Sequence, residues 1–407
     1  MKITKIKVVD SIMGSGKTSA AIQMMNKDAD HKYIFITPFL DEIDRIKHAC
    51  PNKRFFDPKN YDAEGHFTKK QDSFHDLLAK GGNIASTHAL FKQSNEETRE
   101  LIQAGNYVLV LDEVMDIVEY LTIKKSDKEL LFDNKLIYVD NEGYVCWNNE
   151  DKKAKEYDGK FNDVKNMANN RNLLFYRGAI LIWTFPHSIF NAFKKVYILT
   201  YKFSGQIQKY YYDLNNIEYE YFHINHIDSS FTIHEGKSND KEVRNRLKTL
   251  INIYEGTLND IGKEKYSLSN SWYEKRNQSL IRLKNNVSNY FKHKMKAKSN
   301  QIIWTTFKDY QSKISSPGYQ RSFVSCNIRA TNQYKDRSYL AYTANRFMNP
   351  IVEGFFKERK IEIDQDTWAT GELIQWIWRS AIRENGQIHI YIPSQRMRDL
   401  LLRWLEE

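Results

Sequence analysis

The chain has 407 residues, 41% of them hydrophobic and 28% charged, which is a globular composition with room for two domains. Its formal net charge of +10 favours a polyanionic partner, with nucleic acid ahead of an anionic membrane. Three widely spaced cysteines form no CxxC pair, which excludes a zinc ribbon and a disulfide framework. The chain has no apolar signal core and no run of about 18 apolar residues, so we expect a cytoplasmic protein that does not enter a membrane.

Short apolar runs alternate with helical patterns along the first half of the chain. The runs predict buried strands at residues 5–10, 33–38, 83–87, 107–112, 178–183 and 196–201. This alternation is typical of βαβ units around a parallel sheet, and it predicts an α/β fold. Between about residues 121 and 177 the pattern breaks, and residues 135–147 predict a β-hairpin. We interpret that stretch as an insertion in the first domain.

A second α/β half is expected to follow. Residues 211–222 are interpreted as the passage into it, so the first domain is predicted to span 1–214 and the second 215–407. Residues 239–298 are predicted to be largely helical, because an apolar stripe recurs there at helical spacing. The stripe consists of Leu280, Leu283, Val287, Tyr290 and Phe291. Further strands are predicted at residues 301–307, 322–327 and 387–393.

The segment SIMGSGKT, from Ser11 to Thr18, has the residue types of a phosphate-binding loop and lies between a predicted strand and a predicted helix. Backbone N–H groups of such a loop surround phosphate oxygens, helped by the helix N-terminus. Lys17 is expected to bridge the β- and γ-phosphates, and Thr18 to bind Mg²⁺ through its hydroxyl. The strict pattern has Gly where this chain has Ser11. The expected ATP-binding residues are Gly14, Ser15, Gly16, Lys17, Thr18 and Ser19.

Two carboxylates end a predicted strand 95 residues after Lys17 (112 minus 17). Asp112, at the tip of that strand, is expected to hold Mg²⁺ directly or through water. Glu113 is expected to orient and deprotonate the attacking water. An isolated Asp-Glu pair is usually a solvated turn, but the preceding phosphate loop favours the catalytic interpretation.

Gln375, Arg379 and Arg383 are spaced i, i+4 and i+8 in a predicted helix near the end of the chain. On one helix all three side chains face the same way, while Trp376 and Trp378 point elsewhere and pack. Arginines of the second domain are expected to act as arginine fingers on ATP bound by the first domain. The alternative interpretation is a basic helix face that lies on solvent or pairs with neighbouring acids.

With these three elements in order, the chain resembles the superfamily 2 (DEAD/DEAH-like) helicases, especially the small replication helicases of bacteriophages. SIMGSGKT looks like motif I, LDEV like motif II and QWIWRSAIR like motif VI, although motif VI usually spaces its Gln and arginines slightly differently. The resemblance implies two RecA-like domains with one ATP site in the cleft between them. It implies ATP and Mg²⁺ as cofactors, and catalytic roles for Gln375 and for Arg379 or Arg383.

The same resemblance implies residues that contact nucleic acid. Residues 36–46 resemble motif Ia and residues 86–91 resemble motif Ib, so the expected backbone contacts are Thr37, Ser86, Thr87 and His88. Thr200 lies where motif III couples ATP to movement, and residues 304–310 and 329–336 fall where motifs IV and V would be. Only ten residues precede Ser11, which leaves no room for a glutamine motif, so selectivity for adenine is expected to be weak or to arise elsewhere.

The expected function is that of an ATP-dependent helicase or translocase in the replication or recombination of a phage or mobile element. Its expected partner is single-stranded or forked nucleic acid, with DNA favoured. An aromatic content of 14% would supply stacking faces for unpaired bases. One alternative is a nucleic-acid-stimulated ATPase that remodels without unwinding. The other is a P-loop small-molecule kinase, a class whose usual length would leave the second half of this chain without a role.

Overall fold

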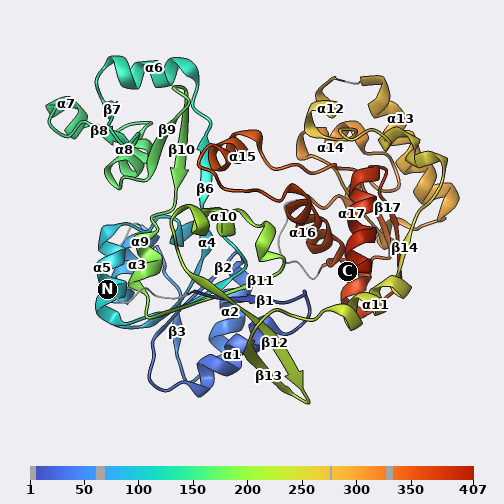
Figure 1. The fold of residues 1–407 in the computed structure, drawn as a ribbon, viewed down its shortest axis with the longest axis horizontal. Helices are drawn as coiled ribbons and strands as arrows, with labels where there is room; N and C mark the ends of the chain where they lie inside the picture. Colours follow the sequence, from blue (N-terminus) through green and yellow to red (C-terminus); the bar gives the residue numbers. More distant parts are fainter. Residues whose placement is uncertain (1–5, 61–68, 276, 327–332) are drawn as a thin grey trace. The chain divides into compact units, whose positions relative to one another are not determined.

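The computed structural model describes residues 6–60, 69–275, 277–326 and 333–407, and these fall into two compact units. The first unit holds the described residues up to Asp10, together with Gly16–Gly236 and Asn349–Ile363. The second unit holds Ser11–Ser15, Lys237–Met348 and Asp364–Glu407. The chain therefore crosses between the units several times (Figure 1).

The first unit is built on an eight-stranded sheet in which all neighbouring strands are parallel except the last pair. In sheet order the strands are β3 (Phe55–Phe56), β4 (Asn83–Thr87), β2 (Tyr33–Thr37), β5 (Val108–Asp112), β11 (Lys195–Thr200), β1 (Ile6–Asp10), β12 (Tyr219–Ile227) and β13 (Ser230–Glu235). The strands predicted from apolar runs are present within about two residues, but the run at residues 178–183 does not belong to this parallel sheet, because it forms a strand of a separate antiparallel sheet. The predicted α/β fold with a parallel sheet is confirmed.

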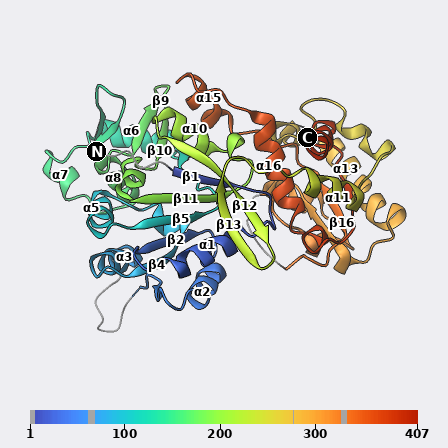
Figure 2. The same cartoon turned by 60° about the horizontal axis from the view of Figure 1, so that its bottom comes forward.

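Helices flank this sheet (Figure 2). They are α1 (Lys17–Lys27), α2 (Leu40–Ala49), α3 (Lys70–Ala79), α4 (His88–Phe91), α5 (Glu96–Gly105), α9 (Ser188–Ala192) and α10 (Ile207–Leu214). Met25 of α1 and Ile46 of α2 are fully buried in a cluster with Phe35 and Val110 of the sheet. The central strands β2 and β5 are buried along almost their whole length, as expected where a sheet is covered on both faces.

The predicted insertion forms a small arm with its own antiparallel sheet, in the order β6 (Val118–Leu121), β10 (Ile180–Thr184) and β9 (Leu173–Tyr176). The predicted hairpin is confirmed, since β7 (Ile137–Val139) pairs antiparallel with β8 (Val145–Trp147). The helices of the arm are α6 (Lys125–Asp133), α7 (Lys152–Lys155) and α8 (Asn162–Asn169).

Helix α15 (Pro350–Lys357) belongs to the first unit although it lies far along the chain. The side chain of Asn349 caps the helix by accepting the N–H of Ile351, and Pro350 follows in the first turn, where its missing N–H costs nothing. Its buried Phe355 packs edge-on against Tyr176 of β9, and Phe356 packs against Tyr210 of α10. The chain therefore returns to the first unit at residues 349–363, and aromatic contacts hold this segment there.

The second unit has a four-stranded parallel sheet in the order β14 (Ile251–Ile253), β17 (Ile388–Tyr391), β16 (Tyr339–Tyr342) and β15 (Ile302–Thr305). Around it lie α11 (Lys241–Leu250), α12 (Asn270–Lys275), α13 (Asn277–Asn289), α14 (Gln311–Ile314), α16 (Gln365–Ile377) and α17 (Gln395–Glu406). The predicted apolar stripe, which runs along α13 and continues into the π-helical turn Tyr290–Lys294, is buried in one core with Trp304 and Tyr391 of the sheet. The second half is therefore also α/β.

Two predictions about this region need correction. Residues 322–326 form no strand in the described part of the chain, where Phe323 makes only an isolated bridge to Trp304. The Val324 carbonyl accepts the indole N–H of Trp376 at 3.1 Å. A side chain therefore provides the hydrogen-bond donor that the backbone of a neighbouring strand would provide in a sheet. The domain boundary predicted at residue 214 also differs, because β12 pairs with β1 and the first unit continues to Gly236.

Among the described residues, no helix is both long enough and apolar enough to span a bilayer.

Candidate functional site

The loop between β1 and α1 has the backbone that a phosphate-binding loop requires. Gly14 and Gly16 have φ values of 79° and 88°, a left-handed conformation that glycine adopts without strain. Gly16 is the N-cap of α1 and provides no side-chain cap, and a helix N-terminus of this kind favours an anion. Asp10, at the end of β1, accepts the N–H groups of Lys202 and Phe203 at 2.8 and 3.0 Å, which anchors the start of the loop.

The acidic pair lies beside the first turn of α1. β11 alone separates β1 from β5, so Asp112 at the carboxyl end of β5 lies close to the loop. The hydroxyl of Thr18 donates to Oδ1 of Asp112 at 3.4 Å. Glu113 has a left-handed φ of 65°, and its N–H donates to the Leu199 carbonyl at 2.9 Å. A non-glycine residue held in this conformation is typical of functional sites, because the surrounding structure has to offset the strain.

Burial raises the pKa of Asp112 to about 7, with the charges of Glu113 and Glu42 adding to the effect and those of Lys17 and Arg45 opposing it. At neutral pH the positive charges near Asp112 are too few to stabilise its ionised form fully. A divalent cation placed at Thr18 and Asp112 would supply that charge and favour the ionised form.

These residues fit a cation that arrives with a phosphate ligand. No group of three or more His, Cys, Asp or Glu in the described ranges could hold a metal by itself. Mg²⁺ suits such a site, because it is usually bound by one or two protein oxygens together with substrate phosphates and water. The buried hydroxyl of Ser15 has no hydrogen-bond partner among the described residues, which leaves it available to a phosphate oxygen.

Replacing Asp112 with Asn is expected to stabilise the metal-free protein increasingly as the pH rises. The folded-state pKa of about 7 lies above the ordinary value of 3.8 for an aspartate, so the native state holds this proton more tightly than the unfolded chain. Ionising Asp112 therefore lowers the free energy of unfolding between about pH 4 and 7, by up to about 4 kcal/mol, and Asn removes that loss. Urea unfolding of both proteins in EDTA from pH 5 to 8 measures it. A difference between them that does not change with pH would contradict the desolvation of Asp112.

The residues predicted to contact nucleic acid lie at the carboxyl ends of β2 and β4, where Thr37 pairs in register with Thr87. Thr37 and Ser86 are buried to 0% and 2% exposure, so neither reaches solvent as a direct phosphate contact. His88 is also largely buried, and its Nε2 lies 2.9 Å from the Asp112 carbonyl oxygen. His88 therefore connects this end of the sheet to the acidic pair.

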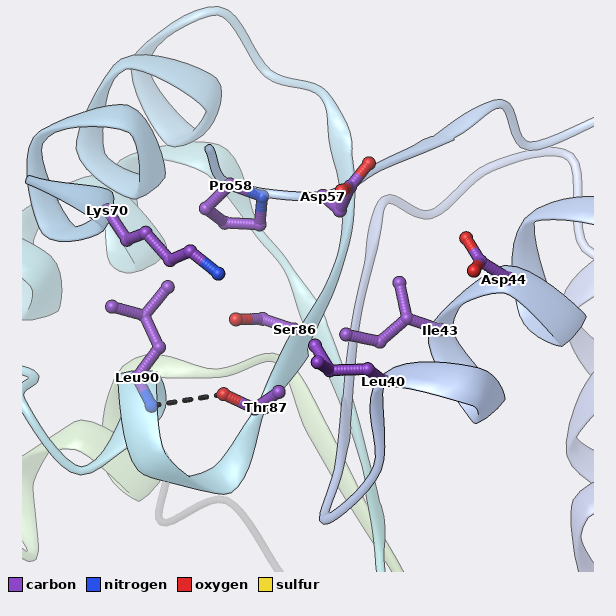
Figure 3. Close-up of a pocket in the computed structure, with 9 residues that line it drawn as sticks. All are labelled: Leu40, Ile43, Asp44, Asp57, Pro58, Lys70, Ser86, Thr87 and Leu90. Carbon is purple, nitrogen blue, oxygen red and sulfur yellow. Dashed lines mark hydrogen bonds between the residues drawn. The ribbon is translucent and has the colours of Figure 1, made fainter. Parts of the chain in front are cut away.

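A hollow of about 250 Å³ adjoins these residues (Figure 3). Its lining consists of Leu40, Ile43, Asp44, Asp57, Pro58, Lys70, Ser86, Thr87 and Leu90. The Thr87 hydroxyl caps α4 by accepting the N–H of Leu90, and the exposed Lys70 points into the hollow from α3. Lys70 belongs to no recognised motif and was not among the predicted contacts.

Thr200 ends β11 in register with Asp10 of β1, between the loop and the acidic strand. It is fully buried, and its hydroxyl has no hydrogen-bond partner among the described residues. Its position between the two predicted catalytic strands is compatible with the coupling role expected from motif III.

The predicted arginine face is wrong. α16 ends at Ile377, and Ser380 has an extended backbone (ψ −171°) whose side chain caps a separate short 3-10 helix, η7 (Ala381–Glu384). Arg379 therefore lies between the two helices, 5% exposed, with one guanidinium N–H donating to the Gln375 carbonyl at 2.9 Å. Arg383 is exposed on η7. The two arginines have different environments, whereas both tryptophans pack in the core as predicted.

Motif V was expected at residues 329–336, of which 329–332 lie outside the described residues. Residues 304–310, expected for motif IV, include the end of β15, where Thr305 and Thr306 are fully buried. The Thr306 hydroxyl donates to the Tyr273 hydroxyl at 2.9 Å, so this residue is part of the core network.

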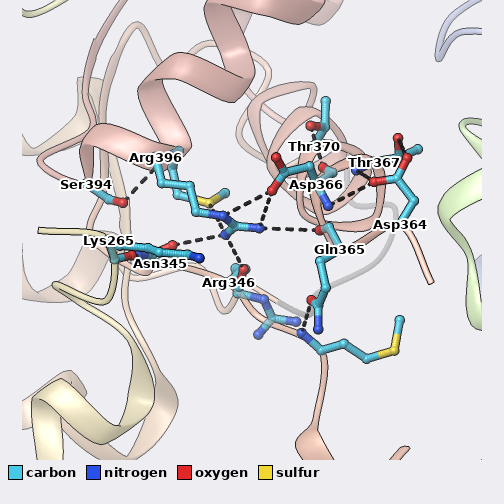
Figure 4. A network of polar contacts seen from close by, with 12 residues as sticks. Lys265, Asn345, Arg346, Asp364, Gln365, Asp366, Thr367, Thr370, Ser394 and Arg396 are labelled. Atoms are coloured by element: carbon cyan, nitrogen blue, oxygen red, sulfur yellow. Dashed lines mark hydrogen bonds and ion pairs between the residues drawn. The ribbon is translucent and has the colours of Figure 1, made fainter. Parts of the chain in front are cut away.

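A polar network in the second unit went unrecognised in the sequence (Figure 4). Arg396 of α17 donates to the side chain of Asn345, to the Arg346 carbonyl and to Asp366, at 3.1, 2.7 and 2.8 Å. Arg346 in turn pairs with Glu372 at 2.9 Å. The signal for it was the run Thr343–Met348 directly after the apolar strand β16, the usual location of functional groups in a parallel sheet.

Comparisons with known proteins match most of the chain. A family model described as the YonV C-terminal Rossmann-like domain matches residues 245–405, and one described as the YonV middle domain matches residues 118–183. The SPbeta prophage-derived protein YonV of Bacillus subtilis (strain 168) is 48% identical over 406 residues, which cover 99% of either chain. A solved structure of S. tokodaii Xpd4 aligns with 98% of this chain and 94% of its own, with a TM-score of 0.48 and 11% identity. So low a likeness is no evidence of a shared activity.

Proposed function

The chain belongs to the YonV family, and we propose that it is an ATP-driven motor that acts on nucleic acid. One observation supports the ATPase part of the proposal above the others. Thr18 lies in the first turn of α1, directly after the glycine loop, and its hydroxyl contacts Asp112. Asp112 ends β5, which is separated from β1 by β11 alone. A phosphate loop and an acidic pair in this arrangement are the parts that hydrolyse nucleoside triphosphates.

In the proposed reaction, the loop N–H groups and Lys17 bind the phosphates, and Thr18 and Asp112 would hold Mg²⁺. The cation supplies charge neutralisation for the phosphates when it is bound. Glu113 accepts a proton from the attacking water and orients it toward the γ-phosphate. The left-handed backbone of Glu113, anchored by its N–H to β11, would fix the direction in which its carboxylate points.

The nucleic-acid partner is supported by charge and by the identity of the relative. The net charge is +10, and the family member in B. subtilis is prophage-derived, which favours a role in phage or mobile-element DNA metabolism. Of the predicted contacts, Thr87 borders the hollow that Lys70 also lines. We propose this edge of the first sheet as a phosphate-backbone contact, with Thr37 and Ser86 as its buried support.

The test of the proposal is ATP hydrolysis by the full chain, measured alone and with single-stranded DNA, single-stranded RNA and duplex DNA. Stimulation by one of the single strands supports the motor, and a forked substrate with a labelled strand then separates unwinding from remodelling without unwinding. Hydrolysis that no nucleic acid changes would contradict the motor and would favour the kinase alternative.

Binding of single-stranded DNA is expected to weaken steeply as salt rises, because each phosphate contact releases counterions. With a handful of contacts, the affinity should fall by roughly 10³-fold between 50 and 200 mM salt. Fluorescence anisotropy of labelled oligonucleotides of several sequences measures both this slope and any sequence preference. Lys70→Ala should lower the slope by about one unit. A flat salt dependence, or strong selection among sequences, would count against backbone tracking.

A further inference from the structure

The hairpin formed by β12 and β13 extends past the end of the strand that carries the phosphate loop. β12 pairs with β1 only as far as Phe222 opposite Val9, and its remaining residues run on beyond the carboxyl end of the sheet (Figure 1). β13 returns antiparallel to it, with His226 opposite Phe231. The tip of the hairpin therefore projects on the side of the sheet where the loop lies.

The hairpin tip is held against helix α1 at two points. The side chain of Gln23 accepts the N–H of Phe231 at 3.0 Å and donates to the Ser229 carbonyl at 3.2 Å. The ring of Phe231 lies so close to Gly16 that a Cβ built there would stand 2.3 Å from two ring carbons. Glycine is therefore needed at position 16 both for its backbone conformation and for the approach of this ring.

His226 and Phe231 form a parallel ring stack on one face of the hairpin. Their centroids are 4.2 Å apart and their planes differ by 4°. The side chain of His226 is exposed and that of Phe231 half-buried, so the histidine is the outer, solvent-facing ring of the stack. Aromatic faces of this kind stack on nucleobases with little regard to their identity.

The order of the strands places this stack where the base of a bound nucleotide is expected. The acidic pair ends β5, on one side of β1, whereas β12 and β13 lie on the other side of β1. In a nucleoside triphosphate the base and the γ-phosphate are at opposite ends. If the phosphates lie at the N-terminus of α1 with the cation toward Asp112, the base lies on the other side of β1, toward the hairpin.

We propose that the stacked His226–Phe231 pair is the platform on which the purine base of the bound nucleoside triphosphate stacks. This inference rests on the proposed phosphate site. Stacking on a ring face depends little on which purine is bound, so ATP and GTP should bind alike, and pyrimidine nucleotides, which have a smaller ring system, more weakly.

The experiment is calorimetric titration of the full chain in Mg²⁺ with ATP, GTP, CTP and inorganic tripolyphosphate, which has no base. The wild-type protein is expected to bind the two purine nucleotides about tenfold or more tighter than tripolyphosphate. His226→Ala and Phe231→Ala should each weaken ATP binding by about tenfold and leave tripolyphosphate unchanged. Phe231→Tyr, which keeps the ring, should retain wild-type affinity. In turnover assays the two Ala variants should raise KM for ATP and leave kcat unchanged.

Ile227→Ala is the matched control. Ile227 is 62% exposed on the same hairpin, but the alternation of side chains along a strand places it on the other face from His226. It should change neither ligand's affinity. Unchanged tripolyphosphate binding also shows that each variant is folded.

The proposed stacking platform is wrong if the wild-type protein binds ATP and tripolyphosphate with equal affinity, or if Phe231→Ala leaves the affinity for ATP unchanged. A tighter binding of ATP by Phe231→Ala would also overturn it, because the ring would then cover the phosphate site rather than support the base. Failure of the proposed function has a different signature: Lys17→Ala would leave the affinity for both ATP and tripolyphosphate unchanged. A failed platform alone leaves that dependence on Lys17 intact.

Discussion

Replacing Lys17 with Ala is expected to reduce ATP hydrolysis by roughly 10²–10³-fold or more while leaving the fold intact. Lys17 is the first residue of α1 and only 9% exposed, beside the glycine loop and within the electrostatic reach of Asp112. Its ammonium group is expected to stabilise charge on the β- and γ-phosphates, and Ala leaves that charge uncompensated. Steady-state phosphate release, with circular dichroism to verify folding, measures the effect.

The matched control is Lys27→Ala. Lys27 is exposed in the last turn of the same helix, so its loss removes the same charge far from the loop. Turnover should stay within about twofold of wild type. If Lys17→Ala hydrolyses ATP as fast as Lys27→Ala, the assignment of the loop as a phosphate site is wrong.

The second large effect is expected for Glu113→Gln, which should lower turnover by roughly 10²–10⁴-fold without loss of ATP binding. The amide keeps the size of the side chain, but it cannot accept a proton from water. Asp112 and Thr18 are unchanged, so Mg²⁺ and the phosphates should still bind. Single-turnover hydrolysis and nucleotide titration, carried out on the same preparation, separate the two quantities.

Asp116→Asn is the control for that variant, since it also removes a carboxylate, at an exposed position three residues further along the chain. It should hydrolyse ATP normally. A Glu113→Gln protein that no longer binds ATP would mean that Glu113, rather than Asp112, is the principal partner of the cation.

The parts of the fold that could be predicted are those that a pattern of residue types within one short segment of the chain reveals. Buried strands of the parallel sheets with a continuous apolar run are predictable, as β2 and β5 show, although β16, with the four-residue run YLAY between polar neighbours, is not among the predicted strands. The glycine loop is recognisable because the pattern SIMGSGKT between a strand and a helix has the residue types expected of a phosphate-binding loop. β14, with only three residues, is too short to stand out from the helical pattern around it.

Other parts depend on contacts that no local pattern records. The run Gln375–Arg383 keeps helical spacing, and only the extended backbone of Ser380, with its capping bond, separates the two arginines. β12 and β13 are half-exposed and rich in polar residues, so neither is predicted as a strand, and the start of β12 falls in the segment 211–222 that is interpreted as a passage between domains. Their place in the first sheet follows from pairing with β1, more than 200 residues away (219 minus 6 is 213).

The return of residues 349–363 to the first unit has a consequence for synthesis on the ribosome. A unit that is contiguous in sequence can complete its folding as soon as its last residue emerges. Here Tyr176 and Tyr210 acquire their aromatic partners Phe355 and Phe356 only after most of the chain has been translated. Until then the site of α15 is an apolar surface exposed to solvent.

The same connectivity restricts how the protein can be divided. A fragment that stops at residue 214 lacks two strands of its sheet, and one that stops at Gly236 still lacks α15. Fusing residues 349–363 to the end of the longer fragment through a flexible linker would restore the missing helix. Such a fusion, rather than a simple truncation, is the appropriate form in which to study the first unit in isolation.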